Sequence, residues 1–150
     1  MRSLFNQAEY LLIRNRVEKL QPAAVRQWGQ MDAAQMLAHC NAGLKQLLGK
    51  APVEDQSNFL TRTLIKSLVM GAVRKGDLGQ SQKTVPEFVV ADPRDFELEK
   101  KAVLQHLDEL YLKAGHMPLA KHPVFGSFTK EQWGGFQYAH LDHHLRQFSA

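Results

Sequence analysis

Apolar and polar residues follow each other along this chain with the period of an α-helix. Apolar positions three or four residues apart place one face of a helix against a core and leave the other face to solvent. This pattern predicts helices over roughly residues 4–20, 32–48, 57–75, 93–114 and 129–148. Strand-like alternation is nearly absent, so the sequence predicts an all-α fold.

Residues that favour helix ends stand at the boundaries of these segments. Asp32 and Thr129 each precede a helix, and a glutamine three residues later can complete a capping box. The fourth helix is expected to begin at Pro93, with Asp92 as its N-cap. Gly76 is expected to end the third helix.

Between the third and fourth helices lies a long connection, residues 76–95, rich in glycine, proline and aspartate. Connections of this length cross a domain or carry function. We therefore expect one domain, residues 1–150, folded as a four-helix bundle with a long crossover and a short extra helix. Sites in such bundles are built from inward side chains on different helices.

Three histidines fall within the stretch YAHLDHHLRQF near the end of the chain. Helical residues advance about 100° each, so with Phe136 at zero, His140 falls at about 40° and His144 at about 80°. Both angles lie within the apolar arc that also holds Trp133. His143 falls at about 340°, on the boundary of that arc. The inward pair is therefore His140 and His144.

Two inward histidines four residues apart can share one cation, because their Cβ atoms lie about 5–6 Å apart. This spacing alone is weakly specific, so a third ligand is needed to define a site. The candidate is His39, on the flank of the apolar stripe of the second helix, where Gly43 one turn later leaves room beside it. A purely structural role for His39 stays open, as does a pair of His140 with His143.

These segments resemble a known group of proteins. WGQMDAAQMLAHC resembles the helix of the DinB/YfiT-like superfamily that contributes its first metal-binding histidine, and HLDHHLRQ resembles its C-terminal ligand helix. Residues 122–148 are similar to a DinB-like family of unknown function with a His-Pro-x-Phe-Gly loop before its last helix. The resemblance implies a bundle, often dimeric, in which His39, His140 and His144 bind a divalent metal such as Ni²⁺, Zn²⁺ or Fe²⁺.

The resemblance also suggests an activity, since some superfamily members are thiol-dependent transferases and others are hydrolases or isomerases. We expect a metal-dependent transferase or hydrolase that takes a small-molecule substrate or a thiol cosubstrate. Three neutral imidazoles leave coordination positions open, as catalytic metal sites do. The alternative is a non-enzymatic helical interaction module with a structural or vestigial metal.

Three further side chains are candidates for the same site. Gln147, one turn past His144, can accept a hydrogen bond that orients the imidazole, or can be an ordinary surface residue. His122, in the loop before the last helix, can act as an acid–base group or fourth ligand, or can bond to the backbone. Cys40 can be a nucleophile or ligand, although a buried, inert thiol is the simpler interpretation.

The charge of the chain adds little to this picture. The net charge is +4, and a loose group of basic residues in the middle can be a solvated helical face or a nucleic-acid patch. This group comprises Arg62, Lys66, Arg74, Lys75 and Lys83. Without basic–aromatic interleaving we do not expect a nucleic-acid partner. No apolar run reaches the roughly 20 residues of a membrane span, and the start of the chain does not read as a signal peptide. A single cysteine then favours the cytoplasm.

Overall fold

The computed structural model describes residues 1–80 and 86–150 of the chain. Five α-helices, and no strand, are found among these residues, which confirms the predicted all-α class. Their bounds are α1 Gln7–Lys19, α2 Ala33–Leu47, α3 Lys66–Lys75, α4 Phe96–Lys113 and α5 Lys130–Gln147. A π-helix, η1 Thr61–Ile65, leads into α3, and a 3₁₀ turn, η2 Pro86–Phe88, lies in the long connection.

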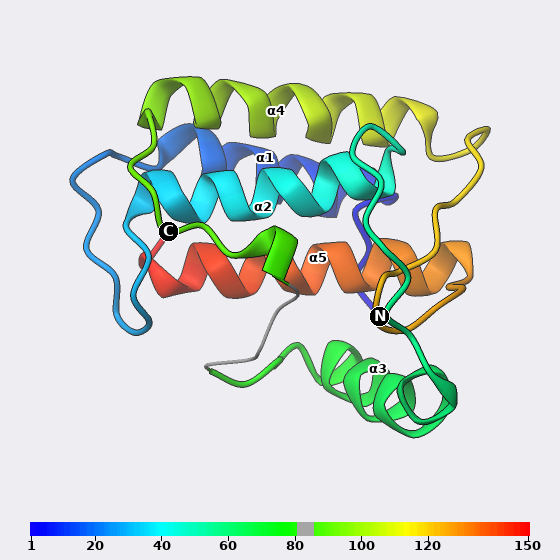
Figure 1. Ribbon diagram of the computed structural model, residues 1–150. Coiled ribbons are helices and arrows are strands. Elements are labelled where there is room, and N and C mark those ends of the chain that lie inside the picture. Colours follow the sequence, from blue (N-terminus) through cyan, green and yellow to red (C-terminus); the bar gives the residue numbers. More distant parts are fainter. Residues whose placement is uncertain (81–85) are drawn as a thin grey trace.

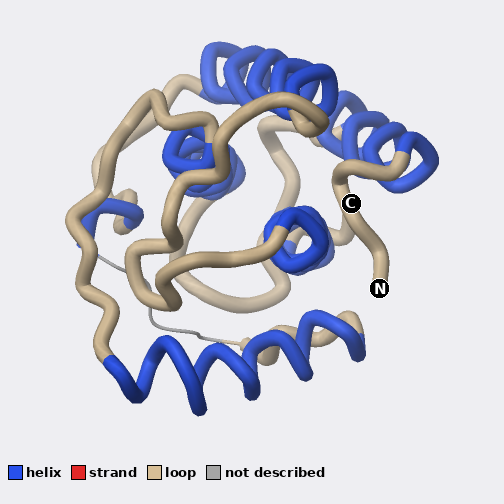
Figure 2. Tube along the Cα trace, turned by 90° about the vertical axis from the view of Figure 1, so that its right-hand side faces the viewer, coloured by secondary structure: helices blue, strands red, loops and turns tan. Residues whose placement is uncertain are grey.

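Four of the helices, α1, α2, α4 and α5, lie side by side as a bundle (Figure 1). Helix α2 packs against both α4 and α5, and α1 closes the bundle on the other side. Helix α3 stands apart from these four, beside α5, and runs across the direction of the bundle (Figure 2). Turn η2 returns to contact α2, so the long connection joins the outlying helix to the bundle.

The core follows the apolar faces that the sequence predicts. Its fully buried side chains include Ile13, Leu44, Leu47, Leu107, Trp133 and Leu141. Each such side chain contributes roughly 1.5–3 kcal/mol through burial, so this core can hold the fold without help from a bound ion. Among the described residues, no helix has both the length and the apolar character needed to cross a membrane.

Both predicted capping boxes are present. The Asp32 side chain accepts from the Gln35 backbone N–H at 2.8 Å, and the Gln35 side chain accepts in return from the Asp32 N–H at 2.9 Å. Thr129 makes the same reciprocal pair with Gln132 at the start of α5. These caps fix where the two histidine-bearing helices begin.

The predicted start of the fourth helix was wrong by three residues. Helix α4 begins at Phe96, and its N-cap is Asp95, whose carboxylate accepts from the Leu98 backbone N–H at 3.0 Å. Asp92 instead pairs with Arg94 at 3.1 Å and leaves Pro93 outside the helix. Both aspartates are good N-caps by residue type. The Asp92 carboxylate pairs with Arg94 instead of accepting from a helix N–H.

The first and third helices also begin later than predicted. Asn6 caps α1 by accepting from the Ala8 N–H, because the Leu4 backbone N–H donates instead to the Gly134 carbonyl at 3.1 Å. In the third segment, Asn58 accepts from the Thr61 N–H at 3.1 Å, so Ser57 lies outside the helical turns. Gly76 ends α3 as predicted, and the structure shows that it does so with a positive φ of 73°.

Candidate metal centre

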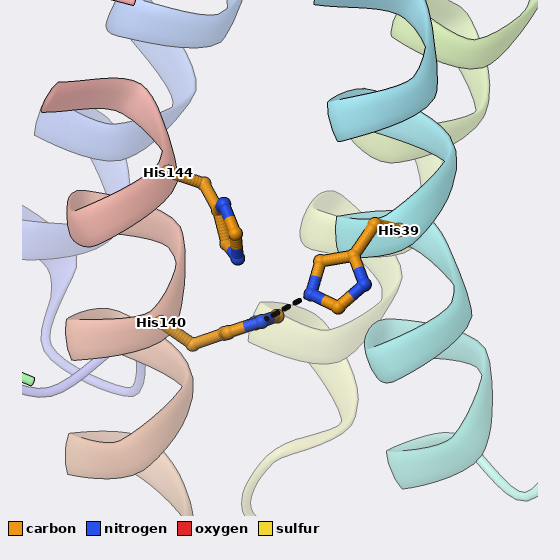
Figure 3. Close-up of side chains that lie close together, drawn as sticks. All are labelled: His39, His140 and His144. Atoms are coloured by element: carbon orange, nitrogen blue, oxygen red, sulfur yellow. Dashed lines mark hydrogen bonds between the residues drawn. The ribbon is translucent and has the colours of Figure 1, made fainter. Parts of the chain in front are cut away.

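Three histidines from two helices converge between α2 and α5. Helix α2 supplies His39, and α5 supplies His140 and His144 (Figure 3). Their ring centroids form a nearly equilateral triangle, with separations of 5.0, 4.7 and 4.8 Å. One nitrogen from each ring lies within 4.8 Å of the others. The structure thus brings together the three residues that the sequence singled out.

A backbone carbonyl from the long connection orients His39. Its Nδ1 lies 2.8 Å from the Phe88 carbonyl oxygen, which can only accept, so Nδ1 carries the proton. The lone pair is therefore on Nε2, which faces Nε2 of His140 at 2.9 Å. Turn η2 thus fixes the tautomer in which His39 can act as a ligand.

His144 is oriented by a chain of two hydrogen bonds that ends on the backbone. The amide nitrogen of Gln147 donates to the Trp28 carbonyl at 2.7 Å, so its Oε1 faces the imidazole. That oxygen lies 3.0 Å from His144 Nδ1 and accepts its proton, which leaves the lone pair on Nε2. Gln147 therefore stands in the position expected of an orienting acceptor, and it is buried rather than on the surface.

His140 differs from the other two, because its Nδ1 is buried without a hydrogen-bond partner among the described residues. The Oε1 atom of Gln137, one turn earlier on α5, is also buried and unpaired. The two side chains are neighbours, since a Cβ built on Gly43 would lie 3.7 Å from His140 Cε1 and 3.9 Å from Gln137 Oε1. The sequence analysis missed Gln137, although its three-residue spacing from His140 mirrors that of Gln147 and His144.

These observations test whether a metal ion fits. Without an ion, His140 Nε2 must donate to His39 Nε2, and its bare Nδ1 is then a buried, unpaired acceptor. An ion on the three Nε2 atoms would move that proton to Nδ1, which would then need an acceptor, and the unpaired Gln137 oxygen one turn earlier on α5 is the candidate. Nitrogens 2.9 Å apart can both lie about 2.0–2.1 Å from one ion. Two ligand nitrogens on one ion lie at most about 4.2 Å apart, so any separation near the upper bound of 4.8 Å would have to shorten on binding.

Burial keeps all three imidazoles neutral at physiological pH. It lowers the pKa of His39 below its usual value, and lowers that of His140 well below it, with the neighbouring histidines adding to the effect. The pKa of His144 falls to about 3, first through burial and then through His39. Neutral rings keep their lone pairs available, which is the protonation state that metal ligation requires.

The three histidines form part of the wall of a cavity of about 670 Å³. The cavity lies between α2, α3, α5 and the long connection, and its walls include Phe88, Phe125, Phe136 and Val69. The ring of Phe136 stacks parallel to His140, with the centroids 6.2 Å apart. A ligand bound in the cavity would therefore contact the histidine cluster directly.

A family model with the description "Protein of unknown function (DUF1569)" matches residues 6–150. The chain belongs to the DUF1569 family. No curated protein and no solved structure matches the chain.

His143 lies at the edge of the cluster, consistent with its boundary position on the helical wheel. Its ring lies 5.1 Å from the ring of His144 and 5.6 Å from that of Trp28, and it is absent from the group of three that can share an ion. Asp142, its neighbour, forms ion pairs with Arg16 and Arg146. Neither residue therefore competes with Gln147 for His144.

His122 lies in the cavity wall but outside the histidine cluster. Its Nδ1 accepts from the backbone N–H groups of Val124 at 3.1 Å and Phe125 at 3.2 Å, so the proton is on Nε2. Burial, with a smaller contribution from Lys66, lowers its pKa to about 3. The structure places this residue as a backbone-bonded loop histidine, outside the group of three that can share an ion.

Cys40 and the basic group lie away from the centre. Cys40 is buried in the core with its Sγ 3.7 Å from Met36 Sδ, and burial raises the pKa of its thiol. A neutral thiol in the core fits the inert interpretation. Lys66 is partly buried and donates to the Ser127 carbonyl. Lys83 lies outside the described residues.

Proposed function

We propose that this DUF1569 protein binds one divalent transition-metal ion through His39, His140 and His144. The observation that carries the proposal is the orientation of the rings, because acceptors hold Nδ1 of His39 and His144 and turn both Nε2 lone pairs inward. Histidines that served packing alone would not need two lone pairs directed at the same small space.

The donor set suits particular metals. Three neutral imidazoles favour Zn²⁺, Ni²⁺ or Fe²⁺ over Mg²⁺ or Ca²⁺, which prefer oxygen ligands. They leave the full positive charge of the ion uncompensated and its remaining positions open. A closed structural site would need a fourth protein ligand, and the group that can share an ion in the described chain holds only three residues.

We further propose that the protein is an enzyme, either a hydrolase or a thiol-dependent transferase. When bound, the metal would lower the pKa of a coordinated water or thiol and so supply the nucleophile. The chain's own part is to hold three lone pairs in place and to offer an apolar pocket beside them, with Phe136 against His140. The alternative, a non-enzymatic module with a vestigial metal, does not account for this cavity.

We also propose that the family belongs to the DinB/YfiT-like superfamily. What supports this is the order of the helices, the long crossover before α4, and the origin of the three histidines from α2 and α5. The superfamily resemblance is independent of the lone-pair argument, so the metal proposal does not depend on it.

The test is metal content. Protein purified without chelator should contain about one transition-metal ion per chain, and apo protein should gain thermal stability on addition of Zn²⁺ or Ni²⁺. His39→Ala should abolish both effects, whereas the control His116→Ala, in an exposed loop, should preserve them. Metal-free protein whose melting is unchanged by these ions would refute the proposal.

A further inference from the structure

The cavity beside the three histidines is large but carries no charge. No aspartate, glutamate, lysine or arginine is found among the described residues that line it, although the chain as a whole contains 19 basic and 15 acidic residues. Its polar groups are glutamines, histidines and two tryptophans. The described lining therefore offers no carboxylate, ammonium or guanidinium group to a ligand.

The rest of the wall is apolar and aromatic. Phe136 is close to two of the histidines in the wall. Its ring centroid lies 6.2 Å from that of His140 and 5.0 Å from that of His122. Phe125 stacks on His122 with the centroids 4.5 Å apart. A volume of about 670 Å³ is in the range that holds a drug-sized organic molecule.

One neutral hydrogen-bond donor stands within this aromatic surface. Nε2 of His122 carries the proton, because Nδ1 accepts from Val124 and Phe125. The described residues give that N–H no partner. It can therefore donate to an uncharged acceptor on a ligand, such as a carbonyl or ether oxygen.

The charges in such a site constrain what can bind. A divalent ion held by three neutral histidines attracts an anionic donor atom to an open position. A ligand charge that lies away from the ion would face an apolar wall with no opposite charge to pair with it, and burying an unpaired charge is strongly unfavourable. The tripeptide thiol glutathione carries several charges beyond its sulfur, so it is poorly matched to this wall.

We propose that the ligand of this cavity is an uncharged apolar or aromatic molecule that presents a single anionic donor, such as a thiolate, to the metal. This inference rests on the proposed metal site and specifies its substrate class. It favours an apolar thiol or an apolar hydrolysable substrate over the charged low-molecular-weight thiols. The thiol binds with loss of its proton to solvent, and no bond of the ligand body is broken.

The experiment uses Co²⁺-loaded protein, because thiolate binding to Co²⁺ gives a charge-transfer absorption band. Three probes are titrated: benzyl mercaptan, 4-(mercaptomethyl)benzoate and glutathione. The first two share the same arene and differ by one carboxylate, so their comparison isolates the effect of charge. Benzyl mercaptan should bind roughly tenfold or more tightly than either charged thiol, since only it buries its whole body without an unpaired charge.

A charge placed at the cavity rim should reverse the preference. Val89 lines the cavity and is 62% exposed, so Val89→Lys adds a cation without disturbing the core. This variant should bind the carboxylated arene relatively more tightly than the wild type does. The matched control is Leu112→Lys on α4, at a site that is 76% exposed and outside the cavity, and it should leave the ratio unchanged.

The outcomes separate the two proposals. Failure to bind Co²⁺ would refute the metal site and, with it, this inference. Binding of Co²⁺ with equal or tighter binding of glutathione or the carboxylated arene would refute the inference alone. The same holds if both lysine variants change the ratio equally.

Discussion

Gly29 makes room for the amide of Gln147. A Cβ built on Gly29 would lie 2.5 Å from Gln147 Nε2, and the backbone at Gly29 has a φ of +78°. The same Nε2 donates to the Trp28 carbonyl, and the other end of the amide accepts from His144. The loop before α2 therefore sets the position of a candidate metal ligand on α5.

Gly29→Ala should both destabilise the protein and weaken metal binding. A left-handed backbone costs a residue with a Cβ about 1–2 kcal/mol, and the displaced Gln147 amide would no longer hold His144, a loss that typically weakens metal binding 10- to 100-fold. Denaturant unfolding of the apo protein and Zn²⁺ titration measure the two effects. Gly71→Ala, in α3 with nothing within 4 Å, is the matched control and should leave metal affinity unchanged. Equal affinities in the two variants would contradict the role of Gln147.

The neighbours His143 and His144 should respond differently to removal. His144→Ala deletes one of the three converging rings and should lower metal content sharply. His143→Ala removes a ring that contacts Trp28 instead, so the metal should stay bound. Metal content is measured on equal amounts of folded protein. Loss in the His143 variant with retention in the His144 variant would move the site to His140 with His143.

How far the sequence predicted this centre depends on the range of each interaction. Helical periodicity placed His140 and His144 on one face, and the capping boxes of Asp32 and Thr129 were found because they involve residues three apart. The Phe88 carbonyl could not be predicted, since every residue has a carbonyl and the connection that carries this one has no periodicity. Asp92 and Asp95 are equivalent N-caps by residue type, so the sequence could not show which one begins α4. The structure shows Asp92 in an ion pair with Arg94.

Gln137 should matter to the metal-bound state and not to the apo state. In the apo protein its Oε1 is buried and unpaired, and its Nε2 donates to the Gly43 carbonyl at 3.4 Å. Gln137→Leu therefore removes an unsatisfied acceptor together with one long hydrogen bond, and should change the melting temperature little. With metal bound, the acceptor for His140 Nδ1–H is lost, and the affinity should fall about tenfold or more. Calorimetric metal titration and apo melting curves test the two halves. An unchanged affinity would show that Gln137 does not orient His140.

The pH dependence of stability tests the buried, neutral state of His122. Its folded-state pKa is about 3, whereas an unfolded histidine has a pKa of about 6.5. Between these values the unfolded chain binds a proton that the folded chain does not, so stability is lost as the pH falls below about 6.5. At pH 5.5 this single group should cost on the order of 1 kcal/mol relative to pH 7.5.

His122→Asn isolates this contribution. The asparagine oxygen can accept from the Val124 and Phe125 N–H groups as Nδ1 does, but it cannot ionise. Urea unfolding of the two apo proteins at pH 7.5 and 5.5, with chelator present, gives the measurement. Because the other buried histidines titrate equally in both proteins, the stability difference should shift by on the order of 1 kcal/mol in favour of the variant at the lower pH. A difference that does not change with pH would mean that His122 is protonated, or open to solvent, in the folded protein.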